Sequence, residues 1–271
     1  MTLDLSNKTI LFVHIYKTAG SSFRSILTNN FGKNHITVNF TNEPVYEFTK
    51  EEFERIHKLN PKFQALSTNH IDISDLDRNN FVIVSFIRDP FRQVVSHFKQ
   101  LIKLDIEKNN KDHFKSFAKR HLNAQTNILL GNKKVYSQTF ERVFNSYTFI
   151  GLTEEFDESL VVFKKKILNC PEFDVRYKKQ NVSKVELAFD ISDSEKKEIY
   201  ELNKLDYQLY LQVKKTLENC KREIGDEFIR DVEKFKIENT NYKPPYLKTN
   251  YNRFLRRLIL NYQKFFYGRT K

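Results

Sequence analysis

Two short runs of apolar residues constrain the fold of this chain more than any other feature of its sequence. They cover residues 9–15 and 81–87 and are rich in Ile, Val and Phe. Because polar residues hardly interrupt them, each run predicts a strand buried on both faces, which is typical of a parallel sheet covered by helices. A short turn and then apolar residues at helical spacing follow each run. This order predicts an α/β fold, namely a P-loop-like three-layer fold with a central, mostly parallel sheet flanked by helices.

Further patterns add strands and helices to this arrangement. Short apolar runs predict strands at residues 63–68 and 147–152. Helices are predicted where apolar residues repeat at helical spacing after a residue with a hydroxyl or acidic side chain, which can cap the helix start. They cover residues 49–59, 112–130, a segment that begins at Thr153, and 192–218. We expect residues 1–240 to form one domain and residues 241–271 to form a basic and apolar, helical C-terminal extension.

The charge of the chain indicates an anionic partner. Its 271 residues include 46 Lys and Arg against 34 Asp and Glu, which gives a formal net charge of +12. A nucleotide, a polyanionic glycan, nucleic acid and a membrane surface all suit such a charge, and the charge does not choose among them. Nucleic acid is disfavoured as the partner, because the sequence has no zinc-finger, RNP or basic-region pattern.

Cysteine content and hydropathy predict a cytoplasmic location. Cys170 and Cys220 have no metal-ligand spacing and are expected to be reduced, largely buried thiols, which fits a reducing compartment. The first residues lack the pattern of a signal peptide, and no run of about 18 apolar residues predicts a membrane span. The C-terminal extension mixes Arg253, Arg256 and Arg257 with apolar neighbours, so peripheral contact with the inner face of the membrane is a further expectation.

The turn after the first apolar run has the composition of an anion-binding loop. Between the predicted strand and helix it reads Lys17-Thr18-Ala19-Gly20-Ser21-Ser22. In such a turn a helix N-terminus and several backbone N–H groups face one point, and the small residues let an anion approach closely. A serine-capped turn without a ligand is the alternative interpretation. The loop is not a Walker A sequence, because Lys17 precedes the glycine.

A known family shares this loop. Residues 14–22 resemble the HIPKTAGTS element of the membrane-associated carbohydrate sulfotransferases, which include the heparan sulfate 2-O-sulfotransferases. In that family the loop binds the 5′-phosphosulfate of the donor 3′-phosphoadenosine 5′-phosphosulfate (PAPS). The resemblance therefore implies that Lys17 and residues 18–22 bind this group. The chain departs from the element at Tyr16, where proline is usual, and this departure bears on the rigidity of the loop.

A second motif follows the other buried run and reads Arg88-Asp89-Pro90-Phe91-Arg92-Gln93-Val94-Val95-Ser96. An arginine at the end of a strand is often a surface ion-pair partner, here of Asp89. The motif is similar, however, to the RDPxxRxxS element by which sulfotransferases hold the 3′-phosphate of the donor, which implies this role for Arg88 and Ser96. Because ligands of open α/β sheets bind at the carboxyl ends of the strands, both motifs are expected to face one ligand.

The similarity to this family continues downstream and spans residues of about 8 to 215. Residues 127–131, 150–156 and 202–210 are similar to its LLG, GLTEEF and NxxDxxLY stretches. We interpret these three stretches as scaffold that packs the core.

His70 is the predicted catalytic base. It follows the strand predicted at residues 63–68, and histidine is the natural proton acceptor near neutral pH. In the resembling family a histidine after this strand, often preceded by glycine, is the base, and here Asn69 replaces the glycine. His14 is the alternative base, although its place in an apolar strand suits a buried, hydrogen-bonded histidine better.

The resemblance implies a PAPS-dependent sulfotransferase that acts on a hydroxyl of a glycan or glycolipid, without a metal. Lys17 is assigned the stabilisation of charge at the sulfuryl group, and Lys178 and Lys179 are further candidates for binding the acceptor or donor. One alternative is a P-loop-like nucleotide kinase or NTPase, although the lysine such enzymes need after the loop glycine is absent. The other alternative is a non-catalytic protein that binds a nucleotide or another anion.

Overall fold

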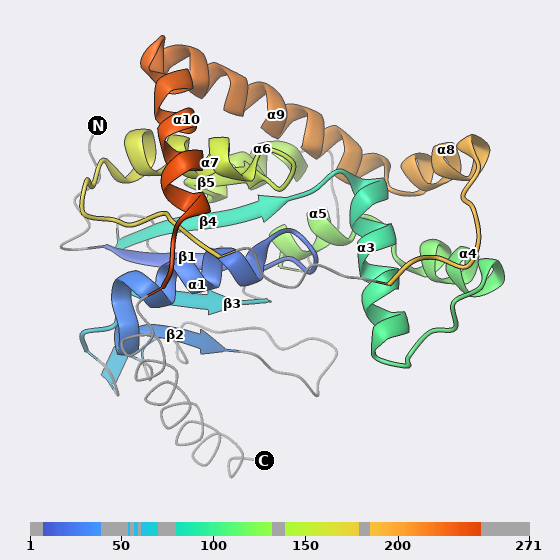
Figure 1. The fold of residues 1–271 in the computed structure, drawn as a ribbon. Coiled ribbons are helices and arrows are strands. Elements are labelled where there is room, and N and C mark those ends of the chain that lie inside the picture. The colour runs from blue at the N-terminus through green and yellow to red at the C-terminus, as the bar shows by residue number, and fades with distance from the viewer. Residues whose placement is uncertain are drawn as a thin grey trace.

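A computed structural model describes most of the chain. It covers residues 8–38, 54, 57–58, 61–69, 80–131, 139–178 and 185–244. Within these residues a central five-stranded sheet is surrounded by helices (Figure 1). The predicted α/β class is therefore confirmed.

The sheet is parallel throughout, and its strand order is β2-β3-β1-β4-β5. The strands are β1 Thr9–Val13, β2 His35–Val38, β3 Ala65–Thr68, β4 Phe81–Ile87 and β5 Phe149–Leu152. β1 lies in the middle, where Val13 pairs with Thr68 of β3 and with Ser85 of β4. Since parallel strands end at the same edge, the segments that follow β1, β3 and β4 meet beside one another.

The edge strand β2 was not predicted. It covers four residues, and its His35 and Thr37 are polar. The structure nevertheless buries His35, whose Nδ1 lies 2.8 Å from the Thr28 hydroxyl and whose Nε2 lies 2.7 Å from the Ser67 hydroxyl. Polar side chains that satisfy one another inside the protein give no hydrophobic pattern, so the sequence did not reveal this strand.

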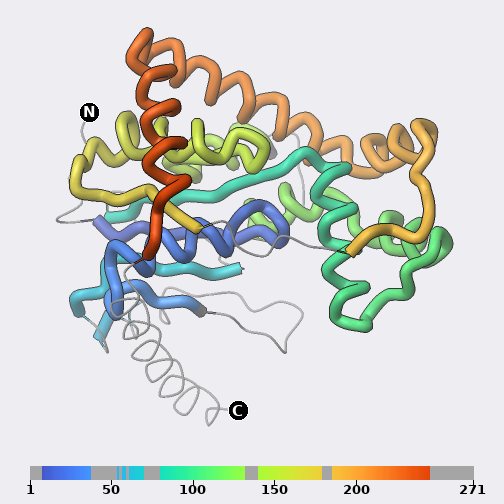
Figure 2. The backbone as a smooth tube through the Cα atoms, viewed as in Figure 1, coloured from blue at the N-terminus to red at the C-terminus, as the bar shows by residue number. Residues whose placement is uncertain are grey.

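Helices pack against the sheet, and some of them also cover the edge formed by β5 (Figures 1 and 2). The helical segments that surround the sheet are α1 Gly20–Phe31, η1 Gly32–Asn34, α5 Ala124–Leu129, α6 Thr139–Ser146, α7 Phe156–Val162, η3 Phe163–Leu168, α9 Lys204–Ile224 and α10 Glu227–Thr240. Helices α3 Pro90–Lys103, α4 Lys111–Arg120 and α8 Asp193–Leu202 gather at one end of the molecule. No helix in the described part of the chain is long and apolar enough to cross a bilayer.

Two long helices predicted from the sequence are each broken in two. The helix predicted at residues 112–130 divides into α4 and α5, and the one at residues 192–218 divides into α8 and α9. The breaks occur at Asn123, whose φ is 46°, and at Asn203. The Asn203 side chain accepts a hydrogen bond from the Asn123 amide at 2.8 Å, and the Asn123 side chain accepts one from the Leu205 amide at 2.9 Å. Each asparagine thus satisfies backbone groups at the opposite break, and periodicity does not detect this long-range exchange.

Other expectations differ from the structure in detail. The helix expected from Thr153 begins at Phe156, because the Thr153 hydroxyl donates to the Ile87 carbonyl at 2.9 Å and holds the chain on β4. Cys170 and Cys220 are unbridged, as expected, but partly exposed rather than buried. Most of the helix predicted at residues 49–59 lies outside the described residues. So does the extension after residue 244.

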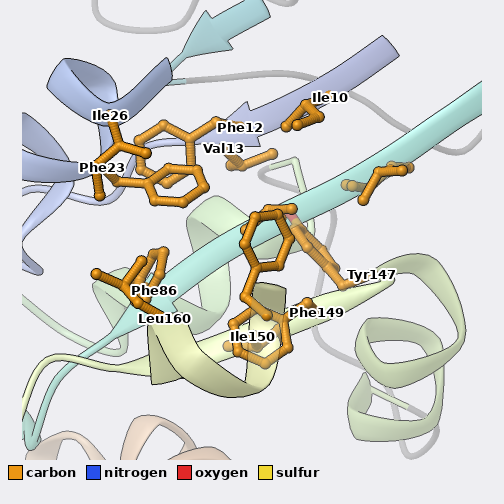
Figure 3. Packing of buried hydrophobic residues seen from close by; sticks show 14 of the residues in the cluster. Ile10, Phe12, Val13, Phe23, Ile26, Phe86, Tyr147, Phe149, Ile150 and Leu160 are labelled. Atoms are coloured by element: carbon orange, nitrogen blue, oxygen red, sulfur yellow. The ribbon is translucent and has the colours of Figure 1, made fainter. Parts of the chain in front are cut away.

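Aromatic rings fill the core between the sheet and its helices (Figure 3). Phe86 of β4 is fully buried and lies 5.0 Å from Phe23 of α1, 4.9 Å from Phe156 of α7 and 6.4 Å from Phe12 of β1, between ring centroids. Ring pairs at these distances add packing energy beyond the burial of their apolar area. The aromatic core therefore fixes α1 and α7 against the strands whose ends carry the two motifs.

Candidate functional site

The loop between β1 and α1 has the backbone shape of an anion-binding turn. Lys17 and Ala19 are left-handed, with φ of 66° and 62°, whereas Thr18 between them is not. Such alternation turns successive backbone N–H groups toward one concave side. Helix α1 begins at Gly20 without a side-chain cap, so its positive N-terminal end adds to the same side.

Gly20 lets this loop lie directly on the ring of His14. A Cβ atom on Gly20 would stand 1.8 Å from Cδ2 and 2.2 Å from Nε2 of His14. No side chain larger than hydrogen fits there without movement of the ring or the loop. Burial, the positive charge of Arg24 and that of Lys17 lower the pKa of His14 to about 3, although its hydrogen bond to Asn69 opposes this shift.

Arg88 closes the site from the end of β4. Its Nη1 donates to the backbone carbonyl of Lys17 at 3.3 Å. The two motifs, predicted to face one ligand, therefore come together at the carboxyl ends of adjacent strands. Nε of Arg88 lies 3.5 Å from Oε1 of Glu154, close enough for charges to interact although these two atoms form no hydrogen bond.

Positive charge is concentrated in this site. Burial lowers the pKa of Lys17, and the charges of Arg88 and Lys103 lower it further. Among the residues that the structure describes, Nζ of Lys17 has no ion-pair or hydrogen-bond partner. Glu154 is the carboxylate paired with Arg88, and burial raises its pKa. Such a cluster of cations favours an anionic ligand.

A chain of hydrogen bonds holds the backbone of Arg88. The Gln125 side chain accepts from the Arg88 amide and donates to its carbonyl, both at 2.8 Å. Gln125 lies in the first turn of helix α5, where buried Asp206 accepts from the amides of Gln125 at 3.1 Å and Thr126 at 2.7 Å. Asp206 belongs to a stretch interpreted from the sequence as core packing. It nevertheless supports the site, because it fixes the helix whose Gln125 holds the main chain of Arg88.

Asp89 joins the site to helices α3 and α8. It caps α3 by accepting from the Arg92 amide at 2.9 Å, and it accepts from the Tyr200 hydroxyl at 2.8 Å. Its own amide donates to Glu154 at 3.3 Å. An acidic residue at this position stabilises the helix start by its interaction with the helix dipole.

A polar network on α3 contacts the loop from the other side. Buried Gln93 donates through Nε2 to the Tyr16 carbonyl at 3.1 Å, and its Oε1 lies 3.2 Å from Nε2 of His121. Since Oε1 only accepts, Nε2 of His121 carries a hydrogen. Nδ1 of His97 lies 3.4 Å from the same nitrogen, so it faces that hydrogen as an acceptor. His97 is therefore neutral, with its hydrogen on Nε2.

Asn69 forms a second junction, at the end of β3. Its Oδ1 accepts from Nη2 of Arg24 at 2.7 Å and lies 3.1 Å from Nδ1 of His14, while its Nδ2 donates to the Tyr16 hydroxyl at 3.2 Å. Because Oδ1 only accepts, His14 carries its hydrogen on Nδ1. The residue before the predicted base His70 is thus tied to the anion loop.

The remaining predicted site residues are placed as follows. Thr18 is buried, and its hydroxyl donates to the Ile15 carbonyl at 2.9 Å, so it supports the loop from inside. Ser21 is partly exposed and Ser22 is buried in the first turn of α1. Ser96 is partly exposed on α3, the helix that starts after Arg88.

The structure does not place the three other predicted residues at this site, because one lies elsewhere and two are outside the described residues. Lys178 is exposed and follows Tyr177, which bonds to Asp157 of α7 and to Asn239 of α10. His70 and Lys179 lie outside the described residues. The roles predicted for all three stay predictions.

Several residues of the site were missed from the sequence, and they are Arg24, Gln93, His97, His121, Gln125 and Glu154. The sequence could have indicated Gln93 and His97. They lie four residues apart on the helix of the second motif, so their side chains are neighbours, and Gln93 belongs to the buried face of that helix. Within the described residues no group of three or more His, Cys, Asp or Glu side chains is placed to hold a metal ion.

Comparison with known proteins gives one match. Residues 3–211, which include every side chain of the site described above, match a family model described as "Sulfotransferase family". A search of curated proteins finds none that matches the chain. The matched segment ends within α9, so helix α10 lies beyond it.

The close contact between Gly20 and His14 gives a testable prediction. We expect Gly20→Ala to lower the free energy of unfolding by about 1–3 kcal/mol, because the added methyl group overpacks the loop against the ring. The same substitution in a His14→Ala background is expected to cost clearly less, because the clashing ring is gone. Chemical denaturation of the four proteins of this double-mutant cycle measures both costs. Equal costs in the two backgrounds would show that the contact is not responsible.

The neutral histidines predict a pH dependence of stability. Burial lowers the pKa of His97 and of His121 to about 4 from an ordinary value of 6.5. Between these values the unfolded chain binds protons that the folded protein does not, so their contribution to stability is complete above about pH 6.5 and is lost as the pH falls toward 4. Gln at position 121 keeps an N–H donor but does not titrate.

The slope of the free energy of unfolding against pH is proportional to the number of protons that the chain takes up on unfolding. We expect His121→Gln to reduce this number by up to about one in this pH range. Urea denaturation at several pH values between 4.5 and 7 measures the slope for both proteins. An unchanged slope would mean that His121 binds protons equally in the folded and unfolded states.

Proposed function

This chain belongs to the sulfotransferase family, and from that premise we propose that it transfers a sulfuryl group from PAPS to a hydroxyl of a carbohydrate. It is an enzyme of the transferase class. The observation that carries the proposal is the contact of Arg88 with the Lys17 carbonyl, because it brings two anion-binding motifs from separate strands to one ligand site.

The chemistry of the site suits the donor. PAPS carries anionic groups at both ends, a 5′-phosphosulfate and a 3′-phosphate. The alternating loop and Lys17 offer backbone N–H groups and a cation that has no carboxylate partner among the described residues, which suits the phosphosulfate. Arg88 and the start of α3 are proposed to receive the 3′-phosphate, together with Ser96 further along that helix. Sulfotransferases generally use this donor.

Transfer requires a new bond between the acceptor oxygen and sulfur while the bond from sulfur to the bridging phosphate oxygen breaks. The acceptor proton passes to a base, and negative charge develops on the leaving phosphate. Lys17 is proposed to stabilise that charge, which develops in a partly buried site where electrostatic interactions are strong.

His70 is proposed as the base. It directly follows Asn69, which bonds to His14, Arg24 and Tyr16 beside the loop. His14 is less suited to this role, because its pKa is lowered to about 3 and its ring is covered by Gly20. An efficient general base has a pKa near the operating pH.

A carbohydrate acceptor is proposed from the resemblance of residues 14–22 to carbohydrate sulfotransferases of the heparan sulfate 2-O type. A glycan or glycolipid is then the partner. We place residues 1–240 in the catalytic domain and assign the extension after residue 240 to peripheral contact with the cytoplasmic face of a membrane. Exposed Lys178 and its neighbour Lys179 are proposed to contact the acceptor. The family match does not favour a nucleotide kinase or NTPase.

Ligand binding tests the donor. Adenosine 3′,5′-bisphosphate at about 100 times its dissociation constant is expected to raise the free energy of unfolding by about 2.7 kcal/mol, with ATP and AMP less effective at equal concentration. Arg88→Ala is expected to remove most of the preference for the bisphosphate over AMP, because these two ligands differ by the 3′-phosphate. Lys17→Ala is expected to weaken both. Differential scanning fluorimetry and calorimetric titration measure these effects.

Arg222→Ala is the matched control for this test, because Arg222 is exposed on α9 and bonds to Asn219. It should leave all three affinities unchanged. A wild-type protein that binds AMP as tightly as the bisphosphate would contradict the assignment of Arg88.

The proposed base is tested by His70→Ala. Loss of a general base lowers a rate by about 10²–10⁴-fold, so transfer of labelled sulfate from PAPS to a panel of oligosaccharides should fall by this factor. The affinity for adenosine 3′,5′-bisphosphate should stay within about twofold of wild type. His113→Ala is the control, since His113 lies on α4 and pairs with Glu107 rather than with a residue of the loop. Transfer by His70→Ala at a near wild-type rate would falsify the role of His70.

A further inference from the structure

Tyr16 contacts the rest of the site through three separate groups. Its carbonyl accepts from Nε2 of Gln93 at 3.1 Å, and its hydroxyl accepts from Nδ2 of Asn69 at 3.2 Å. Its ring stacks on His97 with 5.7 Å between ring centroids and an angle of 17°. The side chain is nonetheless 36% exposed, so burial does not explain its position. Specific contacts hold it there.

These contacts join three segments that are distant in sequence. Asn69 lies at the end of β3, directly before the proposed base His70. Gln93 and His97 lie on α3, the helix that follows Arg88. Tyr16 itself precedes Lys17 in the anion loop. Tyr16, a residue of the anion loop, therefore contacts both the end of β3 and helix α3.

The orientation of Asn69 makes the bond to Tyr16 specific. Oδ1 of Asn69 accepts from Arg24 and from His14, which leaves its Nδ2 directed at the Tyr16 hydroxyl. A reversed amide would place an N–H group against the Arg24 guanidinium, which only donates. Arg24 thus determines which atom of Asn69 meets Tyr16.

The protonation of His97, on which the Tyr16 ring stacks, is also fixed by hydrogen bonds. The bond from Gln93 to the Tyr16 carbonyl fixes the Gln93 amide, which fixes the hydrogen of His121 and leaves His97 neutral. Burial and the charge of Lys17 both oppose protonation of His97, whose pKa is lowered to about 4. A neutral imidazole adds no positive charge beside Lys17, so the stack is compatible with the cationic site.

The loop needs such support because its backbone is strained. Lys17 and Ala19 are left-handed although neither is glycine. Such a residue is strained and persists only where its surroundings hold it. Tyr16 directly precedes this pair and is fixed at its carbonyl, its ring and its hydroxyl.

We propose that Tyr16 is a positioning residue for sulfuryl transfer, which holds the anion loop in register with the end of β3 through its hydrogen bond to Asn69 and with α3 through its stack on His97. The proposal rests on the function proposed above. Tyr16 and Asn69 are also the two departures noted in the motifs, where proline and glycine are usual in the resembling family. The structure bonds these two residues to each other.

The test uses the full chain and compares Tyr16→Phe, Asn69→Ala and the double variant with wild type. Tyr16→Phe keeps the ring and removes the hydroxyl alone. The matched control is Tyr242→Phe, because the Tyr242 hydroxyl also accepts from an asparagine, Asn29, at 3.2 Å, but lies after α10. Titration calorimetry measures the affinity of each protein for adenosine 3′,5′-bisphosphate.

We expect Tyr16→Phe to weaken this affinity about 3- to 10-fold, which corresponds to the loss of one hydrogen bond. In the Asn69→Ala background Tyr16→Phe should have no further effect, because the partner of the hydroxyl is already absent. Tyr16→Ala, which also removes the stack on His97, should weaken binding more than Tyr16→Phe. Tyr242→Phe should bind like wild type.

Amide hydrogen exchange of the segment containing residues 14–22 provides a readout that needs no ligand. Exchange in this segment is expected to be several-fold faster in Tyr16→Phe and unchanged in Tyr242→Phe. Unchanged exchange in Tyr16→Phe overturns the positioning role, and so does an effect that adds fully to that of Asn69→Ala. If wild type does not bind the bisphosphate, the proposed donor is wrong, and the exchange experiment still decides the role of Tyr16.

Discussion

The concentration of positive charge where β1 and β4 end is the constraint on which the rest of the site depends. Lys17 and Arg88 lie close together at the edge of the sheet, and Lys103 adds a third charge. Like charges in a partly buried site repel one another unless an anion is present. Glu154 is the carboxylate that partly balances Arg88. An anionic ligand bound at this edge of the sheet would therefore stabilise the protein.

Packing and hydrogen bonds in the surrounding fold offset the repulsion between these positive charges. Phe86 packs its ring in the aromatic core and leads directly along β4 to Arg88. Behind Arg88, buried Asp206 holds the start of α5, and Gln125 from that helix holds both backbone groups of the arginine. Apolar packing and satisfied polar groups thus fix the charged residue from opposite sides. Each buried partner is needed, since a polar group left without one is costly.

Neutral histidines are a second feature of the site. The hydrogen-bond networks place the hydrogen of His14 on Nδ1 and that of His97 on Nε2, and the pKa of each is lowered. Neither histidine adds charge near neutral pH, and both contact Tyr16 or the glycine of the loop. They therefore contact the loop without adding positive charge beside its lysine. This division leaves His70, which follows the junction at Asn69, as the residue proposed to accept a proton.

The sequence by itself determined the α/β class, four of the five strands and the two motifs, because continuous apolar runs and adjacent small or charged residues are local patterns. It did not reveal β2, whose polar His35 is satisfied inside the protein. It also did not reveal the breaks at Asn123 and Asn203 or the support of Arg88 by Gln125. Those features are hydrogen bonds between side chains and backbone groups that lie far apart in the chain. Only the tertiary structure decided them, since their direction and length depend on how the strands and helices pack.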